Sequence, residues 1–63
     1  MELNDKIRLL LKGDEVEICT KNDRIISGKV VRLFDRIVGV VHNDVLMFVW
    51  KNEIKELKWI DRS

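Results

Sequence analysis

Proline and tyrosine are absent from this 63-residue sequence, and cysteine and histidine occur once each, as Cys19 and His42. A lone cysteine cannot form a disulfide within the chain, and one cysteine with one histidine supplies too few ligands for a closed zinc site. We therefore expect no metal and no cofactor. No apolar run approaches the ~18 residues of a membrane-spanning helix, and the N-terminus lacks the basic and apolar segments of a secretion signal. We accordingly expect a cytoplasmic protein with no membrane partner.

The length and composition of the chain limit the fold classes that it can adopt. The chain has room for one domain, residues 1–63, and its mix of 46% hydrophobic and 37% charged residues is typical of a soluble globular protein. A monomer this small buries barely enough apolar surface to offset its chain entropy. Small domains compensate with disulfides, metals or oligomerisation, and the composition leaves oligomerisation.

The charge balance argues against a protein that coats nucleic acid through a general basic surface. Twelve lysines and arginines face eleven acidic residues, for a net charge of +1. Non-specific nucleic-acid binders carry a clear basic excess. Any phosphate-binding site must therefore be local.

Residues 4–12 carry the signals of a short helix, with Asn4 or Asp5 as its cap and Gly13 as its stop. Two or three helical turns are marginal alone, so the apolar side must pack on another element. That side is predicted to contain Ile7, Leu10 and Leu11.

From Val16 onward, short β-branched runs predict a mainly β domain. Strands are expected at about residues 15–21, 24–33, 37–42, 45–50 and 54–59. Asn22–Asp23 and Asn43–Asp44 separate neighbouring strands and suit the positive φ angles of tight turns. Such a five-stranded antiparallel sheet bends strongly, helped by Gly28 and Gly39 within its strands. We expect it to curl into a small barrel.

The stretch Val45–Trp50 is apolar at every position. No partner within so short a chain covers both faces of such a strand, so we expect it to form an interface between copies. The side chains predicted at that interface, on this strand and the next, are Val45, Met47, Phe48, Val49, Ile54 and Leu57.

Trp50, Lys51 and Asn52 end this apolar strand just before a turn. A tryptophan ring stacks on a base, a lysine pairs with phosphate, and an asparagine amide both donates to and accepts from a base edge. The three residues therefore suit single-stranded RNA. They also have ordinary alternatives, as an interface anchor, a solvated turn lysine and a turn-forming asparagine.

Two segments resemble the Sm-like family, and within it the bacterial Hfq branch. The stretch Phe34–Leu57 (FDRIVGVVHNDVLMFVWKNEIKEL) is similar, without a gap, to the segment in which Phe-Asp opens the third strand and Tyr-Lys-His ends the fourth. Val16–Gly28 (VEICTKNDRIISG) resembles the first hairpin. Between Gly28 and Phe34 the chain has one residue more than the family pattern, which predicts a bulge or a shifted register in the second strand.

The resemblance covers roughly residues 4–58 and implies a single Sm-like, SH3-like barrel that closes into a homo-oligomeric ring of about five to seven subunits. It places Arg36 and Ile37 beside Trp50, Lys51 and Asn52, at a pore that takes U-rich or A/U-rich single-stranded RNA. The implied role is that of an RNA chaperone or post-transcriptional regulator.

Catalysis has no support in the sequence. No Ser/His/Asp or Cys/His arrangement, paired metal ligands or glycine-rich phosphate loop can be assembled from these residues, so we expect no enzyme. The alternative to RNA binding is an SH3-like barrel that serves as a protein-interaction or assembly module without nucleic acid.

Overall fold

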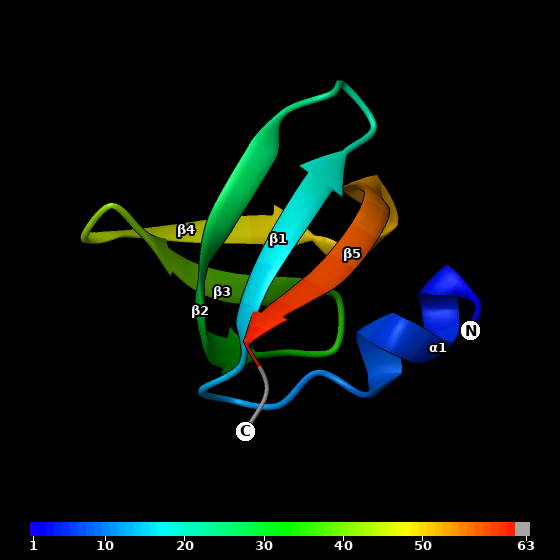
Figure 1. Ribbon diagram of the computed structural model, residues 1–63, viewed down its shortest axis with the longest axis horizontal. Coiled ribbons are helices and arrows are strands. Elements are labelled where there is room, and N and C mark those ends of the chain that lie inside the picture. Colours follow the sequence, from blue (N-terminus) through cyan, green and yellow to red (C-terminus); the bar gives the residue numbers. More distant parts are fainter. Residues whose placement is uncertain (62–63) are drawn as a thin grey trace.

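The computed structural model describes residues 1–61 as a short helix followed by one strongly bent antiparallel sheet (Figure 1). The strand order is β4-β3-β2-β1-β5. The elements are α1 (Leu3–Arg8), β1 (Glu15–Thr20), β2 (Ile25–Leu33), β3 (Ile37–His42), β4 (Val45–Trp50), the 3-10 turn η1 (Lys51–Glu53) and β5 (Ile54–Asp61). The mainly β class and all five predicted strands are confirmed, because the β-branched runs coincide with the strands.

The core lies on the concave side of the bent sheet. Along β1 every second side chain is buried, which is the period of a strand with one face toward a core. The buried apolar side chains are Ile7, Leu10, Val16, Ile18, Ile26, Val30, Val38, Val40, Val49, Ile54 and Leu57. Each such side chain contributes roughly 1.5–3 kcal/mol by leaving water. This small cluster is the main source of stability.

Three of the side chains predicted at an interface between copies belong to this core. Val49 is 5% exposed, and Ile54 and Leu57 are each 2% exposed. Val49 packs inward because it is paired with Val38 of β3, whose side chain is also buried. The core of the single chain therefore takes up these three side chains, which corrects the prediction that they face a second copy.

Strand β2 belongs to both halves of the sheet, and two features of its backbone allow this. At Gly28 a Cβ atom would lie 2.0 Å from the carbonyl oxygen of Val41, so only glycine lets β3 approach so closely. Further along, the pairing with β3 slips by one residue between Val30 and Arg32. This confirms the bulge predicted from the additional residue between Gly28 and Phe34, and bulges increase local bending.

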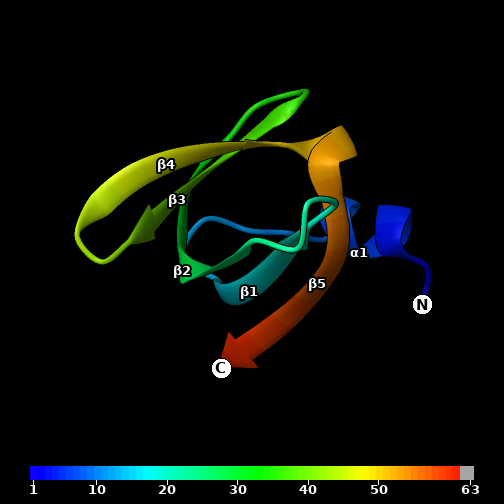
Figure 2. The ribbon, with the colours of Figure 1, turned by 90° about the horizontal axis from the view of Figure 1, so that it is seen from above.

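The sheet has two free edges, β4 and β5, and it does not close on itself. Figure 2 shows these strands leaving η1 in different directions, with β4 along one side of the molecule and β5 along another. Near η1, α1 lies beside β5, and the Lys6 Nζ donates to the Leu57 carbonyl oxygen at 3.3 Å. This hydrogen bond ties the helix to the last strand.

The helix is shorter than predicted. It covers six residues, begins after Glu2 rather than at a cap on Asn4 or Asp5, and ends at Arg8 instead of extending to residue 12. Beyond it the backbone bonds elsewhere: the Leu11 amide donates to Asp14 Oδ2 at 3.0 Å, and the Gly13 amide donates to the Val30 carbonyl at 2.7 Å. The first of these bonds is local and the second is tertiary, and together they take the place of further helical bonds. Within residues 1–61, no helix has the length and apolarity needed to cross a membrane.

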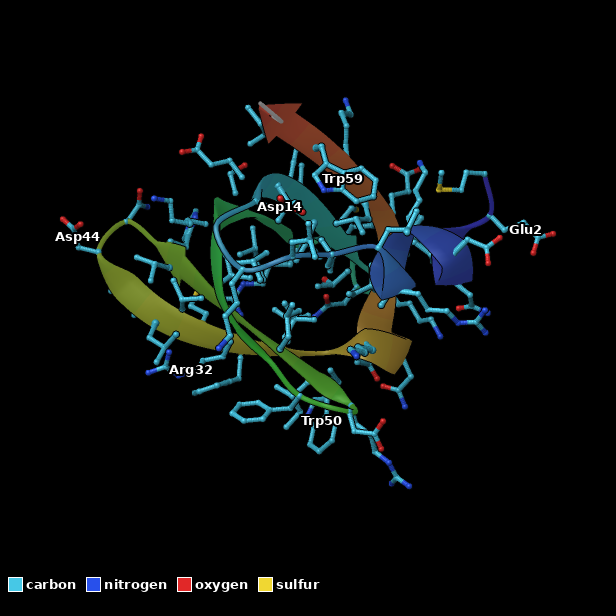
Figure 3. The ribbon with its side chains drawn as sticks, turned by 90° about the horizontal axis from the view of Figure 1, so that it is seen from below. Glu2, Asp14, Arg32, Asp44, Trp50 and Trp59 are labelled. Atoms are coloured by element: carbon cyan, nitrogen blue, oxygen red, sulfur yellow. The ribbon has the colours of Figure 1, made fainter. Side chains whose placement is uncertain are left out.

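The early end of the helix also explains which of the predicted apolar side chains are buried. Ile7 and Leu10 are buried as predicted, but Leu11 is 58% exposed. Leu11 lies beyond the helix end, so the helical spacing that linked it to Ile7 does not apply. Asp14 then anchors the connection to the last strand, because the Trp59 indole donates to its Oδ2 at 2.9 Å (Figure 3).

The turns follow the sequence signals. Asn43 and Asp44 have φ angles of 50° and 63°, as a two-residue hairpin turn between β3 and β4 requires. In the β1–β2 turn, Asp23 alone of the predicted pair has a positive φ, of 65°. The Lys55 ammonium donates to the Asp23 carboxylate at 2.8 Å, and this hydrogen bond and the opposite charges lower the pKa of Asp23 and raise that of Lys55. Because both groups are exposed, the pair adds little stability.

We predict that Gly28→Ala destabilises the protein far more than Gly13→Ala. The added methyl group at Gly28 meets the Val41 carbonyl 2.0 Å away, whereas at Gly13 no atom lies within 4 Å and only its φ of 97° opposes a side chain. We expect Gly28→Ala to lower the free energy of unfolding by about 3 kcal/mol or more, and Gly13→Ala to lower it by about 1–2 kcal/mol. Urea denaturation of both variants at one protein concentration measures these losses. Equal losses would contradict the close approach of β2 and β3.

Candidate nucleic-acid interface

Two turns distant in sequence meet at one end of the β3–β4 hairpin. The Lys51 amide donates to the Arg36 carbonyl at 2.8 Å, which joins η1 to the β2–β3 turn. Immediately beside this bond, Ile37 and Trp50 are partners across the β3–β4 ladder. The backbone therefore brings together Arg36, Ile37, Trp50 and Lys51, as predicted.

The η1 turn is held from its other end as well. The Lys21 amide donates to the Glu53 carbonyl at 2.8 Å, which links η1 to the end of β1. In the β2–β3 turn, the Phe34 amide donates to the Ile37 carbonyl at 3.0 Å. Backbone bonds thus fix both turns, so the side chains that project from them start from defined positions.

A hollow of about 350 Å³ opens between these turns. Four of its five lining residues were predicted to bind RNA, and the lining is Asp35, Arg36, Trp50, Lys51 and Asn52. The fifth predicted residue, Ile37, is half-buried and does not line the hollow. Trp50 is 54% exposed and projects outward from the end of β4 (Figure 3), so one face of its ring is available to a ligand.

A second hollow, of about 430 Å³, continues from the first toward the helix. Asp35, Lys51 and Asn52 line both hollows. The second is completed by Asn4, Ile7 and Arg8 of α1. Sequence reasoning missed these helix residues, because their place depends on how α1 packs beside β5, and no local pattern signals that packing.

The charges around the two hollows are mainly positive. Arg8, Arg36 and Lys51 line them together with a single carboxylate, Asp35. The Arg8 guanidinium lies 3.6 Å from the Asp5 carboxylate, an exposed ion pair that water screens. Arg36 and Lys51 have no carboxylate partner among residues 1–61. The first hollow thus offers two cations without a carboxylate partner, an aromatic ring and an amide, together with the Asp35 carboxylate.

Strand β4 leaves most of its apolar surface uncovered. Val45 is 58% exposed, Phe48 is 54% exposed and Met47 is half-buried, so these three predicted interface residues remain available to a partner. Leu46 is also 46% exposed. An exposed edge strand with large apolar side chains is a surface that proteins normally cover.

Cys19 and His42 do not form part of this site. Cys19 is half-buried on β1, and its thiol contacts the Thr20 carbonyl at 3.7 Å. His42 Nδ1 donates to the Ser27 carbonyl at 2.5 Å, and its Nε2 accepts from Asn43 Nδ2 at 3.3 Å. Among the residues that the structure describes, no group of three or more His, Cys, Asp or Glu side chains is arranged to hold a metal ion.

Comparison with known proteins adds no family to this geometry. No protein-family model matches the chain, and no curated protein sequence matches it either.

Proposed function

We propose that this protein is a cytoplasmic, non-enzymatic RNA-binding protein that works as an Sm-like homo-oligomeric ring. Single-stranded, U-rich or A/U-rich RNA binds in the pore, and the ring acts as an RNA chaperone or post-transcriptional regulator. The observation that carries the proposal is the hollow in which Arg36, Trp50, Lys51 and Asn52 gather from two separate turns.

The side chains of the hollow match the parts of a nucleotide. The Trp50 ring offers a stacking surface for a base, the Lys51 ammonium and the Arg36 guanidinium attract phosphate, and the Asn52 amide suits a base edge. Single-stranded RNA presents all three groups at short range. A folded duplex keeps its base edges and base faces inside, so this combination favours a single strand.

A ring of copies provides partners for the free strand edges and concentrates the positive charge that a single copy carries. The chain leaves two sheet edges, β4 and β5, without a neighbouring strand. Pairing β4 of one copy with β5 of the next satisfies both edges and closes the barrel around each core. Because every Lys51 then faces the same pore, a nearly neutral chain presents a band of concentrated positive charge.

We predict that the protein sediments as a closed oligomer at micromolar concentration and that Val45→Asp dissociates it. A carboxylate at this exposed position of β4 opposes the packing of apolar side chains between copies. Ile25→Asp is the matched control, because Ile25 is 60% exposed but lies on β2, the central strand of the sheet. A stable, folded monomer of the parent protein would rule out the ring.

We predict that Lys51→Ala weakens binding of a short oligouridine and flattens its salt dependence, whereas Lys29→Ala does much less. Each lost phosphate contact lowers the slope of log K against log salt by about 0.7 for a single strand. Lys29 is the control because it lies on β2, where its partner across the ladder is the acidic Glu15. Fluorescence anisotropy over a salt series measures both effects.

Two results would overturn this function. If Lys51→Ala remains an oligomer of the parent's size and binds oligouridine as tightly at every salt concentration, the hollow is not the binding site. If the parent protein binds no single-stranded RNA at low salt, the SH3-like interaction module replaces RNA binding, and the exposed apolar strand β4 becomes a protein-docking surface.

A further inference from the structure

The outward side of the β2–β3–β4 part of the sheet and its β2–β3 turn carry a row of large exposed side chains, of which only Trp50 also lines the hollow. Phe34 and Phe48 are each 54% exposed, as is Trp50 at the edge of the hollow. The two phenylalanine rings have their centroids 6.4 Å apart and are tilted by 35°. This is within the usual range for aromatic rings in contact, so they form one continuous surface.

Gly39 brings a cation to this surface. Across the ladders Gly39 is paired with Arg32 on one side and Phe48 on the other. A Cβ atom at Gly39 would lie 2.7 Å from the Arg32 Cβ and 3.2 Å from the Phe48 ring, so the missing side chain lets both lie close together. Figure 3 shows Arg32 and Trp50 projecting on the same side of the sheet. We call Phe34, Phe48, Trp50 and Arg32 the aromatic face.

The charges of this part of the sheet are of one sign. Strands β2, β3 and β4 contain Lys29 and Arg32 and no acidic residue at any position. Acidic residues flank these strands only in the turns, as Asp23, Asp35, Asp44 and Glu53, and Glu53 lines a hollow with Phe48 and Trp50 at the β4 edge. By contrast, the charged residues of β1 are all acidic, and β5 contains both acidic and basic residues. The outward side of these three strands thus places aromatic rings beside Arg32, and this combination complements a ligand that has stacking groups and negative charge.

We propose that the aromatic face stacks bases of the same single-stranded RNA strand after it leaves the hollow. Trp50 belongs to both surfaces and joins them, and Arg32 pairs with the backbone phosphate beside the stacked bases. The inference rests on the proposed function and extends its site from one nucleotide to several. Aromatic side chains stack on any base, so the extended site is expected to raise the affinity for longer strands without adding a preference for their sequence.

A second copy of the chain fits this surface less well. Pairing between the edges of β4 and β5 uses backbone groups in the plane of the sheet, whereas the aromatic face points away from that plane. A protein that covered the face would also have to place a carboxylate opposite Arg32 to avoid burying an unpaired charge. RNA provides a phosphate there by its repeating structure.

The test compares Phe34→Leu with Phe34→Trp in the oligomeric protein. Leucine keeps an apolar side chain but removes the ring, and Phe34 lies outside both edge strands. We expect Phe34→Leu to weaken binding of a long oligouridine about tenfold and to leave a short one unchanged, while Phe34→Trp restores the affinity. Fluorescence anisotropy gives the affinities, and sedimentation gives the size of the oligomer.

Arg32→Gln provides a second variant, since Arg32 is exposed and its loss leaves no buried gap. We expect it to reduce the salt dependence for the long strand only. If Phe34→Leu and Arg32→Gln bind long oligouridine like the parent while Lys51→Ala does not, the aromatic face is wrong and the proposed function stands. If none of the three variants weakens binding, both fail. A change in oligomer size in Phe34→Leu would assign the face to contacts between copies and overturn the inference.

Discussion

The close approach of β2 and β3 at Gly28 is the constraint on which this fold depends. The Val41 carbonyl occupies the space where any other residue would place its Cβ. This contact, with the slip in pairing between Val30 and Arg32, bends β2 so that one strand serves both halves of the sheet. The bend encloses a core of mostly valine and isoleucine side chains within a single sheet and without a disulfide among the described residues.

The pairing of β3 with β4 creates the candidate site. Because the two strands are antiparallel and Ile37 is paired with Trp50, the end of β4 meets the β2–β3 turn, and the Lys51 amide reaches the Arg36 carbonyl. The residues of the hollow are thus neighbours only in the folded chain. A net charge of +1 gave no sign of a cationic site, because the acidic residues that balance it are largely on β1, β5 and the turns.

Local sequence signals predicted the strands and the Asn43–Asp44 turn, because each depends on the period or the turn chemistry of a short segment. The bulge in β2 followed from the resemblance, whose pattern has one residue fewer between Gly28 and Phe34. The end of the helix was not predictable in this way. The Gly13 amide bonds to the Val30 carbonyl, and a bond between residues so far apart in the chain cannot be predicted from the spacing of apolar residues within the helix. In β4 every residue is apolar, so the sequence does not show which side chains face the core, and Val49 was not predicted to be buried.

The turn η1 has a consequence for any assembly that joins free edges. It is the only connection between β4 and β5, and yet these strands form the opposite edges of the sheet. Backbone hydrogen bonds from Lys51 to Arg36 and from Lys21 to Glu53 hold it at both ends. The turn is therefore a rigid corner, and copies joined edge to edge would trace a polygon whose number of sides follows from this corner. A residue inserted there would change how many copies close the polygon while leaving each edge able to pair.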